Sequence, residues 1–266
     1  MPEGHTIHRL ARRHARLLTG APAYVESPQG RFAEGAALVS GSEVVGTDAW
    51  GKHLFHEYAG GRLVHVHLGL FGRFRDGRLP APEPRGAVRM RVTGESHWLE
   101  LRGPITCEVL TPTERDAVTA RLGPDPLRDD SSAERVLANL VRRRTGIGAL
   151  LMDQCVVAGI GNVYRAEILF RHGLSPWLPG RLVDESSWGV LWEDLRVLMH
   201  AGVRSGRIVT TRPEDRAPGE GRVRQTDAYY VYRREGRPCR LCGTPVRRTT
   251  WGGRNLFWCP TCQPDP

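Results

Sequence analysis

The chain has 266 residues, 40% of them hydrophobic, and a formal net charge of +9 at pH 7. This length fits one large domain or two to three small ones, with enough apolar residues for an ordinary core. Its apolar runs are shorter than the roughly 20 residues that cross a bilayer, and its N-terminus does not resemble a signal peptide. We therefore expect a cytoplasmic protein without a membrane span. The excess of positive charge favours a polyanionic partner such as nucleic acid.

The N-terminal part of the sequence predicts one helix followed by a series of short strands. Apolar residues recur on one helical face between Ile7 and Leu18, and Gly20-Ala21-Pro22 ends this helix. Short β-like runs, separated by turns rich in Gly and Pro, then follow at residues 43–45, 53–56, 63–68, 88–92 and 98–101. This spacing predicts an antiparallel β-sandwich or barrel, and we place this domain at residues 1–125.

The following segment, residues 126–232, predicts a helical domain. Gly123-Pro124-Asp125-Pro126 is typical of a linker. The expected helices cover residues 134–143, 149–157, 162–171 and 186–203. Residues 207–226 lack apolar periodicity and are expected to form a mobile loop. Cys107 and Cys155 each stand alone among apolar residues, so we expect both to be reduced core residues.

The last part, residues 233–266, contains two Cys-x-x-Cys pairs that predict a metal site. The four cysteines are Cys239, Cys242, Cys259 and Cys262. Their spacing is typical of a closed tetrahedral site for one structural Zn²⁺ ion, which supplies folding energy to a short segment. Gly252-Gly253 between the pairs predicts a two-residue hairpin turn, with Arg254 near its tip.

Two further features suggest chemistry. Lys52 is the only lysine, and the other 37 of the 38 Lys and Arg residues are arginines. A lysine amine can act as a compact cation, a base or an imine-forming nucleophile, which an arginine cannot. Farther along, Gly159-Ile160-Gly161-Asn162 predicts a tight turn before a helix, and a helix N-terminus can bind phosphate.

These motifs occur in an order that resembles one family. Met1-Pro2-Glu3-Gly4, Gly51-Lys52, the segment from Gly159 to Tyr164 and the four-cysteine hairpin follow one another over nearly the whole chain. The chain resembles the formamidopyrimidine-DNA glycosylase/endonuclease VIII family, and most closely its actinobacterial endonuclease VIII-like branch. The resemblance implies an α+β protein with an N-terminal helix and antiparallel β-sandwich, a helix–two-turn–helix domain and a C-terminal zinc-finger β-hairpin.

The resemblance also implies an activity and a set of site residues. The expected activity is removal of an oxidised base followed by cleavage of the strand at the abasic site, during base-excision repair. Removal of Met1 would free the α-amine of Pro2 as the imine-forming nucleophile, with Glu3 as general acid/base and Lys52 as the supporting cation. The matching DNA-contact residues are His67, Leu70, Phe71, Arg102, Asn162, Tyr232 and Arg254. In this set Leu70 and Phe71 fill the space left by the extruded nucleotide, and Arg102 reads the base opposite.

Two departures from the family pattern bear on the substrate. Gly148 stands where formamidopyrimidine-type members carry a lysine, and Pro104 stands where a wedge phenylalanine is common. Both favour oxidised pyrimidines over 8-oxoguanine. A purine-lesion glycosylase, an enzyme acting mainly on abasic sites or single strands, and a non-catalytic DNA-binding protein remain alternatives. We expect a monomer that binds damaged double-stranded DNA, with single-stranded or bubble DNA as further substrates, and that associates with the nucleoid.

Overall fold

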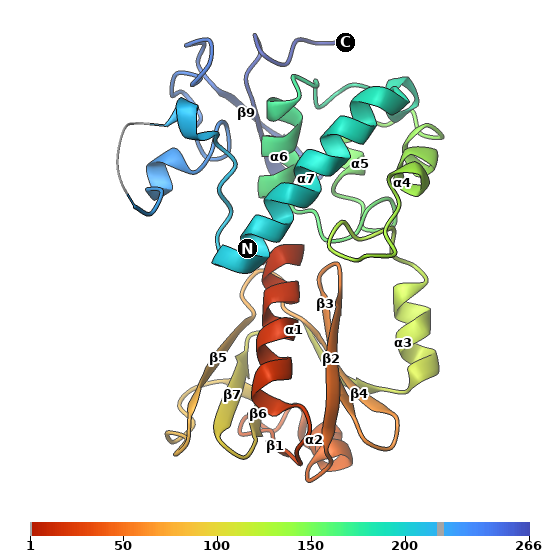
Figure 1. Ribbon diagram of the computed structural model, residues 1–266, viewed down its shortest axis with the longest axis vertical. Coiled ribbons are helices and arrows are strands. Elements are labelled where there is room, and N and C mark those ends of the chain that lie inside the picture. Colours follow the sequence, from red (N-terminus) through yellow and green to blue (C-terminus); the bar gives the residue numbers. More distant parts are fainter. Residues whose placement is uncertain (1, 217–220) are drawn as a thin grey trace. The chain divides into compact units, whose positions relative to one another are not determined.

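The computed structural model describes residues 2–216 and 221–266, and it divides into two compact units, Met1–Arg121 and Leu122–Pro266 (Figure 1). Among the described residues, no helix combines the length and the apolarity that a membrane span requires. The expected boundaries at 125/126 and 232/233 stay predictions. In the second unit the cysteine hairpin shares a small core with α6 (Asn162–Arg171), through Phe170, Val246 and Phe257.

The first unit is built from two antiparallel four-stranded sheets, which confirms the predicted sandwich. One sheet contains β2 (Val44–Trp50), β3 (His53–Tyr58), β4 (Arg62–His67) and β8 (Thr106–Leu110), in that order. The other contains β1 (Tyr24–Glu26), β6 (Val88–Thr93), β7 (His97–Arg102) and β5 (Arg73–Arg78), in that order. Leu54 and Val66 of the first sheet share one buried core with Met90 and Leu99 of the second.

Three helices complete the first unit. Helix α1 (Gly4–Leu18) packs against β2 and β3, and its apolar face, including Ile7 and Leu18, joins the sandwich core. Helix α2 (Ala33–Val39) packs beside β1, and α3 (Pro112–Thr119) follows β8. A capping box between Thr111 and Glu114 fixes the start of α3.

The second unit combines helices with a β-hairpin. Its helices are α4 (Ala133–Leu140), α5 (Ile147–Leu150), α6 and α7 (Glu185–Ser205). A 3-10 turn at Gly180–Leu182 lies between α6 and α7, and two more, Pro213–Asp215 and Gln225–Asp227, follow α7. The hairpin consists of β9 (Arg247–Trp251) and β10 (Arg254–Trp258). Trp188 and Trp192 of α7 pack with Tyr164 and Leu169 of α6 in the main core.

The structure corrects the helix predicted at residues 149–157. Helix α5 ends at Leu150, because polar side chains in the following residues bind the backbone. The Asp153 carboxylate accepts from the Cys155 N–H at 2.9 Å, and Gln154 bonds both Gly159 and Ile160. Cys155 is therefore exposed in a turn, and its prediction as a core residue is wrong.

The expected loop at residues 207–226 is irregular in its described parts, but Thr210 and Thr211 within it are buried. The Thr210 hydroxyl donates to the Glu167 carboxylate, and the Thr211 hydroxyl donates to the Asp227 carbonyl oxygen at 2.6 Å. These contacts fix the beginning of the segment to the second unit. Residues 217–220 lie outside the described residues, so the predicted mobility of the segment remains a prediction there.

Candidate functional site

The first candidate residues lie at the start of α1. The helix begins at Gly4, and Glu3 occupies its N-cap in an extended conformation, with φ −118° and ψ 176°. Glu3 is 0% exposed, and Pro2 beside it is half-buried. The positive end of the helix dipole favours a carboxylate at this position. Met1, whose removal would free the Pro2 amine, lies outside the described residues.

Lys52 lies in the two-residue turn that joins β2 to β3. Trp50 pairs with His53 across this turn, and Gly51 takes a positive φ of 57° at its first position. A type II′ hairpin turn requires glycine there, which explains the Gly51-Lys52 pair. The short turn presents the half-buried Lys52 at the end of the sheet.

Helix α1 and strand β2 bring Glu3 and Lys52 to the same end of the first unit. The residue after α1 bridges to the first residue of β2, and farther along the Thr47 hydroxyl donates to the Ala11 carbonyl oxygen at 2.6 Å. The two elements therefore run side by side in opposite directions. From Ala11 back to Glu3 the helix rises about 12 Å. From Thr47 the strand advances about 10 Å before the Gly51-Lys52 turn, so the turn and the helix start lie at a similar level.

His67 at the end of β4 belongs to the same end of the sheet. It pairs with His53 on β3 and with Thr106 on β8, and its ring meets the His53 ring edge-on at 5.0 Å. Burial lowers the pKa of His67, and the positive charge of Lys52 adds to this shift. His67 therefore lies close enough to Lys52 for the charge of Lys52 to affect its pKa.

An exposed apolar patch follows directly after His67. We use the term apolar patch for Leu70, Phe71 and Ile105, which are 55%, 82% and 70% exposed. The Ile105 N–H donates to the His67 carbonyl oxygen at 3.0 Å, which holds the two loops together. A Cβ on Gly69, which has φ +64°, would lie only 2.3 Å from Ile105 Cδ1. The glycine therefore lets the two loops approach closely.

Arg102 ends β7 and is held by a buried carboxylate. Glu100 is only 2% exposed and pairs with both Arg91 and Arg102, the latter at 2.5 Å. Although burial raises the pKa of Glu100, hydrogen bonds and charge from the two arginines outweigh it and lower the pKa overall. A guanidinium has five N–H donors, so this ion pair orients Arg102 and leaves donors for another partner.

In the second unit, Asn162 connects α6 to the hairpin. It is the first residue of α6, after an N-cap at Gly161, and is 5% exposed. Its Nδ2 donates to the Asn255 carbonyl oxygen on β10 at 2.8 Å, and its Oδ1 accepts from Arg165. Asn162 is therefore held on both sides, which fixes the helix N-terminus relative to the hairpin.

Arg254 lies at the tip of the hairpin, as predicted. Gly252 and Gly253 form the two-residue turn, with φ values of 58° and 71°, and the following Arg254 is exposed. A turn with positive φ at both residues is a type I′ turn, which glycine favours. Arg254 and Arg165 line one concave site of about 310 Å³ beside Met152. The Arg165 guanidinium is buried and donates to the carbonyl oxygens of Gly148 and Asn255, so the exposed Arg254 is the cation of this hollow that can reach a phosphate group.

Tyr232 is positioned by a buried carboxylate on α6. The Glu167 side chain is 0% exposed and accepts hydrogen bonds from the backbone N–H groups of Tyr230, Val231 and Tyr232, at 2.7 to 2.9 Å. Burial raises the pKa of Glu167, and these donors oppose the shift. The half-buried Tyr232 ring packs edge-on against Phe257 of β10. Tyr232 is thus fixed to the same hairpin that carries Arg254.

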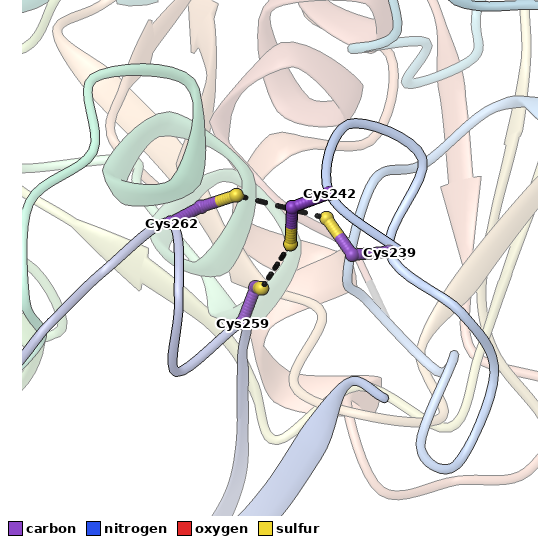
Figure 2. Close-up of side chains that lie close together, drawn as sticks. All are labelled: Cys239, Cys242, Cys259 and Cys262. Atoms are coloured by element: carbon purple, nitrogen blue, oxygen red, sulfur yellow. Dashed lines mark hydrogen bonds between the residues drawn. The ribbon is translucent and has the colours of Figure 1, made fainter. Parts of the chain in front are cut away.

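The four predicted metal ligands meet in one cluster (Figure 2). Their sulfur atoms all lie within 4.8 Å of one another, with Cys239 Sγ 3.8 Å from Cys262 Sγ and Cys242 Sγ 3.4 Å from Cys259 Sγ. Tetrahedral Zn²⁺ with Zn–S bonds of about 2.3 Å separates its sulfur ligands by about 3.8 Å. The cluster therefore fits a tetrahedral metal ion.

Comparison with known proteins identifies the family. Residues 1–104 match the formamidopyrimidine-DNA glycosylase N-terminal domain, and residues 122–213 match the formamidopyrimidine-DNA glycosylase H2TH domain. The chain is 50% identical to endonuclease 8 1 of Mycobacterium tuberculosis, over 99% of this chain and 100% of that protein. It belongs to the formamidopyrimidine-DNA glycosylase/endonuclease VIII family. Its members are DNA glycosylases with abasic-site lyase activity.

Other relatives agree with this assignment. The formamidopyrimidine-DNA glycosylase of Thermus thermophilus is 34% identical over 236 residues, which cover 85% of each protein. The crystal structure of the Thermus thermophilus MutM (Fpg) protein matches the whole of both chains, with a TM-score of 0.81 and 30% identity. The Lactococcus lactis Fpg protein bound to DNA with an abasic site has a TM-score of 0.82 at 20% identity, over 99% of this chain and 100% of that one, which supports the fold alone.

The structure gives a physical reason for one departure from the family pattern. Gly148 lies in α5 between the Pro176 backbone and the Trp251 ring. A Cβ at this position would lie 3.0 Å from both Pro176 Cβ and Pro176 O, and 3.3 Å from the Trp251 ring. A long side chain does not fit there without a shift of those neighbours. Pro104, the other departure, is buried, and the next residue in its loop, Ile105, is exposed.

Two residues at these sites, Ile105 and Arg165, are not among those predicted from the sequence. Ile105 could not be predicted from the sequence, because a single isoleucine after a proline forms no motif. Its exposure depends on the pairing of β8 with β4. Arg165 lies within the apolar run of α6 and is 1% exposed. Its position as a charged residue inside that run was the signal that could have marked it, because buried arginines need partners.

Proposed function

We propose that this protein excises oxidised bases from DNA and then cleaves the strand at the abasic site, with the α-amine of Pro2 as the nucleophile. The observation that carries the proposal is the placement of the α1 start and the Gly51-Lys52 turn at one end of the first unit. Residues that match the family motif for this chemistry therefore lie at the same end of this unit, although 48 positions separate Glu3 from Gly51 in sequence.

The reaction proceeds through an imine. With Met1 removed, the Pro2 nitrogen attacks C1′ of the damaged nucleotide, the glycosidic bond breaks and the base leaves with a proton. The Pro2 nitrogen then loses its own proton, the C1′–O4′ bond breaks with protonation of O4′, and the protonated imine forms. A model α-amine has a pKa of about 7.7–8.0, so a useful fraction is unprotonated near neutral pH. The protonated imine then withdraws electrons from the sugar. Loss of a C2′ proton breaks the bond to the 3′ phosphate, and a second elimination releases the 5′ phosphate.

Glu3 and Lys52 support this reaction in different ways. Glu3 acts as the general acid/base at the sugar ring, where a carboxyl group within hydrogen-bond reach can move a proton. Lys52 stabilises negative charge on the adjoining phosphate as a compact cation. In the alternative assignment the Lys52 amine forms the imine. Its pKa would then have to fall much farther than that of the Pro2 amine, because the ordinary pKa of a lysine side chain is well above that of an α-amine.

Damaged double-stranded DNA is the proposed partner. The first unit presents His67, the apolar patch and Arg102. The second unit presents Tyr232 and Arg254, and its Asn162 lies at the N-terminus of α6. Cations and helix N-termini bind phosphates, while apolar side chains stack on bases exposed by extrusion of the damaged nucleotide. We propose that one monomeric chain binds one lesion and that it acts on chromosomal DNA in the cytoplasm.

Zn²⁺ is the proposed metal of the cysteine cluster. Four thiolates form a closed site with no open position for substrate, so the ion would stabilise the hairpin that carries Arg254 and would take no part in the reaction. Removal of the ion is therefore expected to weaken DNA binding first.

Oxidised pyrimidines are the proposed substrates, because the close packing around Gly148 and the buried Pro104 depart from the formamidopyrimidine-type pattern. The test is a panel of duplexes containing one oxidised pyrimidine, one 8-oxoguanine, one formamidopyrimidine or one abasic site. We expect the fastest excision from the pyrimidine duplexes, and faster excision of purine lesions would contradict this preference. If the protein binds these duplexes but processes none of them, a non-catalytic DNA-binding function replaces the proposal.

Glu3→Gln separates the two steps of the reaction. This variant keeps the size of the side chain and removes its acid/base function, so we expect loss of base excision with retention of cleavage at a preformed abasic site. Lys52→Arg keeps the charge and is expected to impair both steps, because the planar guanidinium misplaces the phosphate.

A further inference from the structure

A series of polar side chains in contact with one another crosses strands β8, β4 and β3 and ends at His53, beside Lys52 in the sequence. Glu108 on β8 lies 2.9 Å from His65 Nδ1 on β4, and His65 Nε2 lies 2.8 Å from His53 Nδ1 on β3. The His53 and His65 rings are stacked, with an interplanar angle of 16°. His53 directly follows Lys52 in the chain, and its ring also meets His67. The series therefore links an outer carboxylate to the residues around Lys52.

The direction of the hydrogen bonds in this series follows from elementary chemistry. A carboxylate only accepts, so His65 must donate its Nδ1–H to Glu108. Burial lowers the pKa of His53 to about 3 and also lowers the pKa of His65, although Glu108 opposes the shift in His65. Each ring then carries one N–H near neutral pH. His65 Nε2 must accept, and His53 must donate from Nδ1.

We propose that Glu108 and His65 are positioning residues that hold His53 in the Nδ1–H tautomer and fix its ring beside Lys52 and His67. In this tautomer His53 Nε2 is an acceptor, and the ring stays neutral next to the cationic Lys52. A fixed His53 ring in turn limits the orientations open to His67, which packs against it. This inference rests on the proposed roles of Lys52 and His67 at the DNA.

Glu108 is the member of this series that can be replaced without disturbing the core. Its side chain is 49% exposed, whereas the His65 side chain is only 5% exposed. Replacement of Glu108 therefore changes the hydrogen bonding of a buried histidine without creating a cavity in the core. Glu108→Gln retains an acceptor for the His65 N–H, and Glu108→Leu removes it. Glu95→Gln, at an exposed carboxylate in the turn between β6 and β7, is the matched control.

Nitrogen-15 NMR of the histidine rings tests the tautomer directly, with no DNA present. We expect His53 to show a protonated Nδ1 and an unprotonated Nε2 in the wild type, in Glu108→Gln and in Glu95→Gln. In Glu108→Leu we expect His53 to shift toward the Nε2–H tautomer, which is the usual form in solution. A wild-type His53 protonated on Nε2 would overturn the proposal.

Single-turnover excision at saturating enzyme tests the consequence. We expect Glu108→Leu to slow excision about tenfold, within the roughly 10²-fold loss that a 1 Å misplacement can cause. Glu108→Gln should restore the rate to within about twofold of the wild type, and DNA affinity should change little in both variants. An unchanged rate in Glu108→Leu, despite a changed His53 tautomer, would refute the positioning role. If the wild type excises no base, the proposed function fails, while the NMR result still decides the tautomer.

Discussion

Acidification should destabilise the first unit because its core contains neutral histidines. His14 and His56 are both 0% exposed and meet through Nδ1 and Nε2 at 2.9 Å. Burial lowers the pKa of His56 to about 4 and lowers the pKa of His14 well below 6.5. Between pH 6.5 and 4 the unfolded chain binds protons that the folded chain does not bind. The free energy of unfolding therefore falls as the pH falls through this range.

The size of the effect follows from the two pKa values of His56. For a shift from 6.5 in the unfolded chain to about 4 in the folded chain, lowering the pH from 7 to 5 removes about 2 kcal/mol of stability. His14 adds a further loss of the same sign. Small domains are stable by only about 5–15 kcal/mol, so these two residues account for a substantial fraction of the total.

The variant His56→Gln isolates this contribution. Glutamine still offers a hydrogen-bond partner to His14 but does not titrate. Urea unfolding at pH 7 and pH 5, followed by pulsed hydrogen exchange of peptides from β3 and β4, reports on the first unit alone. We expect the difference in unfolding free energy between the two pH values to shrink by at least about 2 kcal/mol.

His97→Gln, at a half-buried histidine on the surface of the same unit, is the matched control. It should leave most of the pH dependence in place. An equal pH dependence in the wild type and His56→Gln would show that the buried pair is not the source of acid sensitivity, and the reasoning would be refuted.

Three further predictions concern the DNA-binding residues and the metal. Arg254→Ala should weaken binding to all duplexes alike and reduce the slope of log affinity against log salt by about 1; a change confined to one lesion would argue for base recognition. Ile105→Ser should slow base excision but leave cleavage at a preformed abasic site unchanged. Only base excision requires a side chain to fill the space that the extruded base leaves. Equal effects in both assays would exclude this role for Ile105. Elemental analysis should find one zinc per chain in the wild type and less in Cys242→Ser, which should also bind DNA more weakly; full zinc content in that variant would contradict the four-cysteine site.

The elements with strong periodicity could be predicted from the sequence, and the elements governed by polar contacts could not. Helix α6 was predicted with its observed limits because Asn162 follows a glycine turn and an apolar face continues to Phe170. Strand β5 was missed because its sequence, Arg73–Arg78, is mostly charged. It forms because β7 offers it a paired edge, and a charged outer strand also protects the sheet from further pairing.

The candidate site shows the same division. The cysteine cluster and the Gly252-Gly253 turn could be predicted, because ligand spacing and turn chemistry are local properties of the sequence. The contacts among Glu108, His65 and His53 could not, since they depend on the register of three strands. A shift of one residue in that register would turn each side chain to the other face of the sheet.

The central claim, that the Pro2 amine forms the imine, is tested most directly by borohydride trapping. The Met1-processed protein is incubated with a lesion duplex, the imine is reduced, and the cross-linked peptide is identified by mass spectrometry. Because Lys52 is the only lysine, the α-amine of Pro2 and the Lys52 side chain are the two competing amines. We expect the DNA adduct on Pro2. An adduct on Lys52, or none with any lesion or abasic site, would contradict the mechanism.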